Sequence, residues 1–236
     1  MRDLFLDLEG ITLSYSENGN PDAPTLLLLH GNSENKELFV DYQQKFFADF
    51  HTFAIDSRGH GKSISKDNSL IINQMSDDII AFCRKNNIDK THLIGYSDGG
   101  NIALVAAKKC PTLFEKIIAI SPNYLVKGFK CKELIILQLQ NILCHFRQLL
   151  GAKMQKNIQY LQLMLNDIGI QPADLKEITT QFCILYAQND VIKESHIKEI
   201  AHLLLHSQLH KISLCNHYDI LYKKEAIEIM QQFLSK

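Results

Sequence analysis

The sequence predicts an α/β protein built on a mainly parallel β-sheet. Continuous apolar runs of strand length, such as Thr25–Leu29, alternate along much of the chain with stretches of helical spacing. A glycine-rich segment, Gly95–Gly100, joins one apolar run to a helix-like run. The 236 residues are enough for one large domain that buries a sizeable core without disulfides or metal.

The first half of the chain is predicted to form a strand hairpin followed by alternating strands and helices. Loose alternation over 4–16 predicts the hairpin, and the turn cluster at 18–22 precedes the first buried strand. Helices are expected over 34–47 and 70–87, the second of them amphipathic. The strands expected in this half lie at 25–29, 52–55, 91–94 and 116–120.

The alternation stops between 123 and 179, where apolar spacing predicts three helices. The first covers about 134–149, the second 158–165, and a short third begins at Pro172. Both longer helices are apolar over more than one stripe, which predicts burial against a domain or lining of a pocket. Strands at 181–187 and 211–215 follow, with helices at 192–205 and 223–234.

Composition favours a reduced cytoplasmic protein that binds neither nucleic acid nor a membrane. The formal net charge of -1 and the interspersed charges give no signal for nucleic acid or an anionic membrane. Acids interrupt the first residues where a signal peptide needs an apolar run, and the apolar stretch 134–143 is too short and too polar to span a membrane. The six cysteines form no C-x-x-C pair, so we expect core thiols rather than metal or redox sites. Oligomeric state is left open.

The segment Gly95-Tyr96-Ser97-Asp98-Gly99-Gly100 is the strongest chemical signal. A strand, a sharp turn and a helix around G-x-S-x-G form a nucleophile elbow, so Ser97 is the candidate nucleophile. The following helix N-terminus offers free N–H groups, and that of Asp98 is a candidate donor to an oxyanion. A chance match to five residues is the plain alternative.

A second oxyanion donor is expected in the loop after the strand at 25–29. There His30-Gly31-Asn32-Ser33 makes the backbone N–H of Asn32 the candidate. An ordinary Gly-Asn turn before a helix explains the same residues equally simply. The elbow further along the chain favours the oxyanion interpretation.

Two other motifs are rejected. Gly61-Lys62-Ser63 resembles the end of a phosphate-binding loop, but Asp56 stands where that motif needs its first glycine. His202 and His206 lie one helical turn apart, yet the sequence between them lacks the glutamate of a zinc-protease helix. We therefore expect no nucleotide, metal or other cofactor.

In combination, four motifs make the chain resemble the α/β-hydrolase superfamily, and within it carboxylesterase-like serine hydrolases. They are His30-Gly31-Asn32, Asp56-Ser57-Arg58-Gly59-His60-Gly61, the Gly95–Gly100 elbow and Ile120-Ser121-Pro122. The resemblance implies an eight-stranded, mostly parallel sheet flanked by helices, with a small helical cap inserted after the sixth strand. The core would comprise 1–122 and 180–236, and the cap 123–179.

The resemblance also implies a Ser, acid, His triad. Asp190 follows the strand after the cap, where such proteins place the carboxylate; the less favoured alternative is a turn or helix-cap residue. His217 lies just past the last predicted strand and completes the chain order Ser97, Asp190, His217. The expected activity is hydrolysis of a carboxylic ester or related acyl bond through an acyl-enzyme on Ser97.

Alternatives to this activity remain open. A non-catalytic ligand-sensing or signalling protein can use the same fold. A nucleotide-binding oxidoreductase is less favoured, because Ser97 stands where the second glycine of its fingerprint is needed. The Asp98 side chain could attract a substrate ammonium group, as in relatives with the same Ser-Asp-Gly-Gly run. Alternatively, the acid could simply stabilise the first turn of its helix through the helix dipole.

Overall fold

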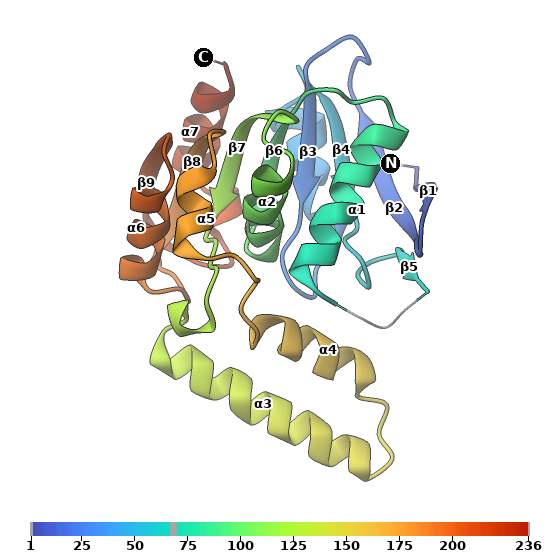
Figure 1. Cartoon of the computed structure of the whole chain (residues 1–236), viewed down its shortest axis with the longest axis vertical. Helices are drawn as coiled ribbons and strands as arrows, with labels where there is room; N and C mark the ends of the chain where they lie inside the picture. The colour runs from blue at the N-terminus through green and yellow to red at the C-terminus, as the bar shows by residue number, and fades with distance from the viewer. Residues whose placement is uncertain (1, 67–69, 236) are drawn as a thin grey trace.

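A single twisted sheet forms the centre of the molecule (Figure 1). The computed structural model describes residues 2–66 and 70–235. Within these residues, eight strands lie in the order β1-β2-β4-β3-β6-β7-β8-β9, and a two-residue strand, β5, pairs with β2. Their bounds are β1 Leu4–Leu8, β2 Ile11–Asn18, β3 Thr25–Leu29, β4 His51–Ile55, β5 Ile64–Ser65, β6 Thr91–Tyr96, β7 Phe114–Ile120, β8 Gln181–Asn189 and β9 Ser207–Asn216.

The sheet is mostly parallel, as the sequence predicts. From β4 to β9 every neighbouring pair is parallel, whereas β1 and β2 form an antiparallel hairpin that also pairs antiparallel with β4. Because the parallel strands share one direction, their carboxyl ends meet at one edge of the sheet. The segments that follow β3, β6, β8 and β9 therefore lie close together, although they are distant in sequence.

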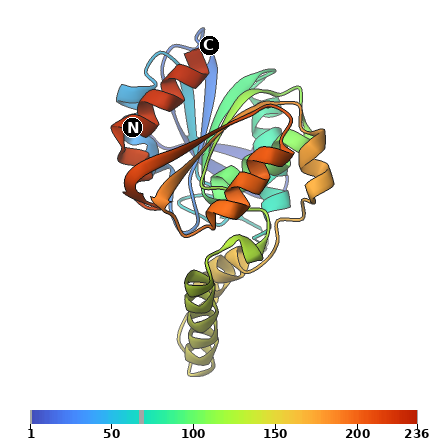
Figure 2. The ribbon, with the colours of Figure 1, turned by 90° about the vertical axis from the view of Figure 1, so that its left-hand side faces the viewer.

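Helices cover both faces of the sheet (Figure 2). Side chains alternate along a strand, so Leu27 and Leu29 pack into one core layer and Leu26 and Leu28 into the other. The first layer includes residues of α1, α2, α5 and α6, and the second includes residues of α7 and of the segment after β3. The bounds are α1 Ile72–Lys85, α2 Asp98–Lys109, α5 Pro172–Glu177, α6 Glu194–Leu203 and α7 Lys224–Ser235.

The segment predicted as a helix over 34–47 is instead two short turns. A 3₁₀ turn covers Lys36–Phe39 and a π turn covers Tyr42–Phe46. The cause is tertiary: the backbone N–H and the ammonium of Lys36 both donate to Asp56, at 2.7 and 2.8 Å. These two bonds to a carboxylate on another loop fix the backbone where a regular helix would begin.

Two helices, α3 Cys131–Leu149 and α4 Gln155–Met164, extend from the core as an arm (Figures 1 and 2). They follow β7, which is the sixth strand when the short β5 is not counted. The sequence predicts burial of these two helices against a domain or lining of a pocket. None of the residues of α3 is buried, but its Glu133, Leu137 and Gln140 line a pocket at the edge of the sheet. In α4, Ile158, Leu161 and Leu163 are buried. No helix in the described part of the chain is long and apolar enough to span a membrane.

The division into a hydrolase core and a cap at 123–179 stays a prediction. The predicted core ranges, 1–122 and 180–236, include residues 1, 67–69 and 236, which lie outside the described residues.

Candidate active site

Ser97 occupies a strained turn between β6 and α2. Its φ of 53° lies in a region that residues other than glycine rarely adopt. A Cβ on Gly95 or Gly99 would overlap backbone atoms of Gly99 or Leu29, respectively. Only glycine lets the chain reverse this tightly, so the turn projects the Ser97 side chain above the sheet edge.

The structure brings Ser97, His217 and Asp190 together. His217 Nε2 lies 3.2 Å from Ser97 Oγ, and His217 Nδ1 lies 2.8 Å from Asp190 Oδ1. Asp190 directly follows β8 and His217 directly follows β9, which are parallel neighbours. The carboxylate, the imidazole and the hydroxyl are therefore hydrogen-bonded in the order needed for the imidazole to deprotonate the serine.

Asp190 is buried and held in its charged form. Burial raises the pKa of its carboxyl, but the hydrogen bond and charge of His217, with bonds from Ser121 and Ala187, leave the pKa below its usual value. Ser121 Oγ donates at 2.5 Å and the Ala187 N–H at 3.0 Å. A second N–H, from Ile192, donates at 3.1 Å to the oxygen that faces His217. A charged Asp190 can orient the imidazole and stabilise an imidazolium.

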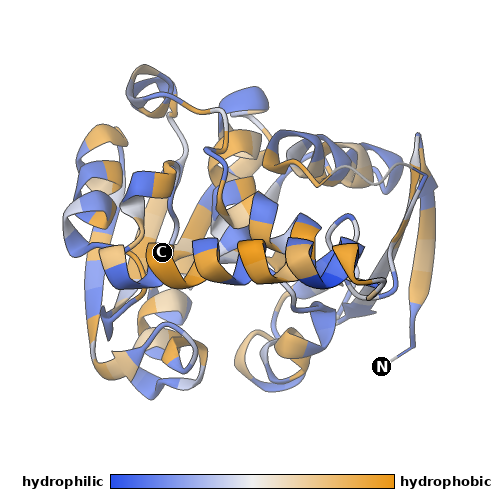
Figure 3. Cartoon of the chain, turned by 90° about the horizontal axis from the view of Figure 1, so that it is seen from below, coloured by the Kyte–Doolittle hydropathy of each residue, from blue (hydrophilic) through white to orange (hydrophobic). Residues whose placement is uncertain are grey.

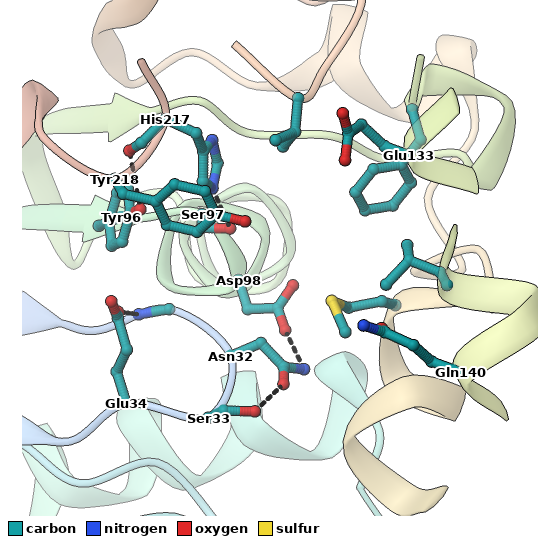
Figure 4. A pocket seen from close by; sticks show the side chains of 15 residues that line it. Asn32, Ser33, Glu34, Tyr96, Ser97, Asp98, Glu133, Gln140, His217 and Tyr218 are labelled. Atoms are coloured by element: carbon teal, nitrogen blue, oxygen red, sulfur yellow. Dashed lines mark hydrogen bonds between the residues drawn. The ribbon is translucent and has the colours of Figure 1, made fainter. Parts of the chain in front are cut away.

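Tyr96 fixes the loop that carries His217. Its hydroxyl donates to the His217 carbonyl at 2.8 Å, and its ring lies 5.2 Å from the imidazole between centroids. Figure 4 shows Tyr96, Tyr218 and His217 grouped beside Ser97. The residue before the candidate nucleophile therefore also positions the candidate base.

The loop after β3 faces Ser97 as expected for an oxyanion site. Among the described residues, the backbone N–H groups of Asn32 and Asp98 show no hydrogen-bond partner. The N–H of Gly31, next to Asn32, is instead occupied by Glu34 Oε2 at 2.9 Å. This bond folds the loop so that Gly31, Asn32 and Ser97 border one pocket.

The pocket holds about 250 Å³ and opens between the sheet edge and the arm (Figure 4). Its apolar wall comes from Phe129, Leu137, Met164 and Val191. Two of these residues, Leu137 and Met164, belong to α3 and α4. The arm thus forms one wall of the pocket that contains Ser97, which is a suitable size for a small ligand.

The polar lining of the pocket is acidic. It includes Glu34, Asp98 and Glu133 but no lysine or arginine among the described residues. Burial raises the pKa of Asp98, although the bonds from Asn32 and Asn101 oppose this. Burial also raises the pKa of Glu34, against the opposing bond from Gly31. A substrate entering this pocket meets carboxyl groups and neutral amides.

The Asp98 side chain has a structural role that the sequence does not indicate. Its Oδ2 accepts from the Asn32 side chain at 3.0 Å, and its Oδ1 accepts from the Asn101 side chain at 3.0 Å. The same Asn32 amide donates to the Tyr160 carbonyl of α4 at 3.1 Å. Asp98 thereby links the elbow to the loop after β3 and to the arm.

Sequence reasoning missed the supporting residues Glu34, Ser121 and Tyr96. Ser121 follows β7, the neighbour of β6 and β8, so its place at the sheet edge is a signal that could have identified it. Glu34 lies three residues after Gly31, a spacing at which a side chain can accept from the backbone of a turn. Tyr96 carries no comparable signal, because its partner is 121 residues away.

The loop 56–61, another of the four motifs, supports the site rather than entering it. His30 Nε2 accepts from the Ser57 N–H at 3.0 Å, and burial, with His60 nearby, lowers the pKa of His30 to about 4. His60 stacks on Tyr160 of α4, whose hydroxyl donates to the Gly59 carbonyl at 3.0 Å. These contacts anchor the arm to the core.

Two curated relatives each match less than half of the chain. It is 32% identical over 115 residues to the 2-(acetamidomethylene)succinate hydrolase of Mesorhizobium japonicum, covering 49% of this chain and 41% of that protein. It is 31% identical over 94 residues to the 1H-3-hydroxy-4-oxoquinoline 2,4-dioxygenase of Pseudomonas putida, covering 40% of this chain and 36% of that protein. The chain thus spans about two fifths of the length of each of these relatives.

Solved structures resemble the whole fold. A carboxylesterase of the thaumarchaeon Nitrososphaera gargenis matches with a TM-score of 0.80 at 19% identity, covering 98% of both chains. A family profile described as the alpha/beta hydrolase fold matches residues 24–157, which is more than half of the chain. With its parallel sheet and its serine elbow between β6 and α2, this chain belongs to the α/β hydrolase fold family.

Proposed function

We infer that the protein is a serine hydrolase that cleaves a carboxylic ester or a related acyl bond of a small molecule. The observation that carries this proposal is the continuous contact from Asp190 through His217 to Ser97, at 2.8 and 3.2 Å. Ser97 borders a pocket next to two backbone N–H groups that lack partners among the described residues. Nucleophile, base and oxyanion donors are the parts that acyl transfer requires.

In the proposed reaction, His217 Nε2 takes the proton of Ser97 Oγ as that oxygen attacks the acyl carbon. The negative charge that develops on the carbonyl oxygen is stabilised by the N–H groups of Asn32 and Asp98. The C–O bond to the leaving alcohol then breaks, and His217 returns the proton to it. Water repeats the cycle on the acyl-enzyme, giving up a proton to His217, and releases the carboxylic acid and Ser97.

A fluorophosphonate probe tests this proposal. The probe should attach to Ser97 and to no other residue, and p-nitrophenyl esters of increasing chain length should reveal the preferred acyl group. Ser97→Ala should lose the adduct and reduce ester turnover by at least about 10³-fold, since removal of such a nucleophile eliminates most of the acceleration.

Ser57→Ala serves as the matched control, because it removes a buried serine hydroxyl outside the pocket. Undiminished turnover in Ser97→Ala would contradict the proposal. Absence of both adduct and turnover in the folded wild-type protein would instead favour a non-catalytic ligand-sensing protein on the same fold.

The acidic lining supports a narrower choice of substrate. Glu34, Asp98 and Glu133 border the pocket without a lysine or arginine among its described lining residues. A dicarboxylate would be repelled there, whereas a neutral or cationic ester would not. The hydrolase of Mesorhizobium japonicum is named for a succinate derivative, and we propose that this chain does not share that substrate preference.

Asp98→Asn tests whether the carboxylate at this position attracts a substrate ammonium group. If it does, kcat/KM for a cationic ester should fall about 10-fold while that for a matched neutral ester changes little. Steady-state kinetics with an amino-acid ester and its uncharged isostere provide the measurement. Equal losses on both substrates would assign Asp98 only its structural links to Asn32 and Asn101.

A further inference from the structure

The outer face of α3 carries a long exposed apolar stripe. Eight of the fifteen large hydrophobic side chains exposed in the described chain lie on α3 or on its C-cap residue. They are Ile135, Ile136, Leu139, Ile142, Leu143, Phe146, Leu149 and Leu150, exposed by 38–85%. Figure 3 views the molecule from this side, and hydrophobic colour follows the long helix nearest the viewer.

The spacing within this stripe is that of a helix-pairing seam. Positions 135, 139, 142, 146 and 149 are separated by steps of four, three, four and three residues. Positions 136, 143 and 150 recur every seven residues beside this seam. A heptad repeat of apolar residues keeps one face of a helix directed at a partner helix. Two heptads therefore present the same continuous face along α3.

The stripe is separate from the surface that α3 uses inside its own chain. Leu137 lines the pocket from the side of the helix opposite the stripe, and Glu133 and Gln140, which also line the pocket, lie along one border of the stripe. α4 packs between α3 and the core, as Figure 1 shows. Movement of the arm toward the pocket would bury the inner face of α3 and leave the stripe in water. The described part of the chain thus supplies no cover for it.

We propose that the stripe is the interface of a homodimer in which α3 packs against α3 of a second copy. A two-fold dimer brings the same surface patch of each copy into contact, and a heptad stripe is complementary to itself. A standard interface buries roughly 800 Å² on each partner. Eight large side chains at the exposures given above provide an apolar area of that order.

The charge pattern favours a second copy over a lipid surface. Helices that lie on membranes are typically rich in lysine and arginine beside their apolar face. On α3 the charged residues are Lys132, Glu133 and Arg147, giving a formal net charge of about +1. Uncharged side chains, including Gln138 and Gln140, flank most of the stripe. Uncharged flanks allow two identical helices to pack closely, because they place few like charges opposite each other.

Analytical ultracentrifugation of the full chain tests this dimer. At micromolar concentration the wild-type protein should sediment with twice the 27.0 kDa mass of one chain. Leu139→Glu combined with Phe146→Glu should raise the dimer dissociation constant by about 100-fold or more, since two carboxylates would be buried in each half. Gln148→Glu is the matched control, because it adds an acid to exposed α3 on the side opposite the stripe and should leave the dimer intact.

Circular dichroism and fluorophosphonate labelling verify that each variant is folded, independently of its association. A wild-type protein that sediments as a monomer overturns the proposal, and so does a dimer that survives the double substitution. Flotation with phosphatidylcholine vesicles, with and without phosphatidylserine, tests the alternative that the stripe binds a lipid surface. Vesicle binding by a monomeric wild type, lost in the double variant, would assign the stripe to lipid.

Discussion

Ser121 shows how one residue outside the candidate triad of Ser97, His217 and Asp190 can position it. Its φ of 52° turns the chain sharply after β7, and its hydroxyl reaches the Asp190 oxygen that does not contact His217. Asp190 thus keeps one oxygen for the imidazole and gives the other to Ser121 and Ala187. Its carboxylate cannot rotate away from His217 without losing these bonds, so Ser121 is a positioning residue.

Ser121→Ala should lower kcat for ester hydrolysis by about 10-fold or more and change KM little. A hydrogen bond to a charged group contributes about 1.5–3 kcal/mol, and here its loss loosens the carboxylate and raises the pKa of Asp190. Steady-state kinetics on one ester give the measurement. Ser57→Ala is the control, since the described residues provide no hydrogen-bond partner for its buried hydroxyl. If Ser121→Ala and Ser57→Ala had the same kcat, Ser121 would have no role in positioning Asp190.

At the scale of elements, the approach of α2 to the sheet depends on the absence of a side chain at Gly99. A Cβ on Gly99 would overlap the carbonyl of Leu29 at the end of β3, whereas a Cβ on Gly100 would lie 3.2 Å from the nearest atom, the Gly95 carbonyl oxygen. The first contact involves backbone of the neighbouring strand and cannot be relieved by a rotamer change. The second requires a shift of only a few tenths of an ångström.

Gly99→Ala should therefore lower the free energy of unfolding by about 3 kcal/mol or more, which is large for a single methyl group. Gly100→Ala adds the same group to the same helix, where better helix propensity offsets a mild clash, so its net effect should be within about 1 kcal/mol. Urea unfolding of both variants gives the comparison. Similar losses in the two proteins would refute the account of the elbow packing.

For the whole molecule, one buried ion pair joins three distant segments. Lys36 is 4% exposed and Asp56 is fully buried, and their charged groups lie 2.8 Å apart. The Lys36 ammonium also donates to Ser14 of β2, and Asp56 accepts from the Lys62 N–H. The loop after β3, the loop after β4 and the N-terminal hairpin are thereby held together beside the candidate site.

This ion pair should make stability depend on pH. Burial raises the pKa of Asp56, but the bonds from Lys36 and Lys62 leave the pKa below the ordinary value of 3.8. A carboxyl with a lowered pKa in the folded state stabilises the fold above pH 3.8, and this contribution is lost as pH falls through the folded-state pKa. Wild-type stability measured by urea unfolding should fall below about pH 4.

Lys36→Met should cost about 3–5 kcal/mol at pH 7, because it leaves the Asp56 carboxylate buried without its cation. The difference from wild type should shrink near pH 3, where the carboxyl binds a proton and needs no partner. Lys45→Met breaks the exposed pair with Asp41 and should cost less than about 1 kcal/mol. A pH-independent loss in Lys36→Met would show that packing, not charge, explains it.

The sequence by itself determined the strands, their parallel arrangement and the candidates Ser97, Asp190 and His217. Apolar runs such as Thr25–Leu29 are local signals, and the ends of parallel strands must share an edge. Gly95 of the elbow also acts locally, because the atoms that a Cβ there would meet belong to Gly99 and Gly100 of the same turn.

Only the tertiary structure decided the rest. The helix expected over 34–47 gives way to two turns because Lys36 binds Asp56 on another loop. The Ser121 bond to Asp190 and the exposed stripe on α3 likewise depend on where distant segments lie. Periodicity reveals that a helix has an apolar face but not whether anything in the chain covers it, because packing partners are set by contacts between residues far apart in sequence.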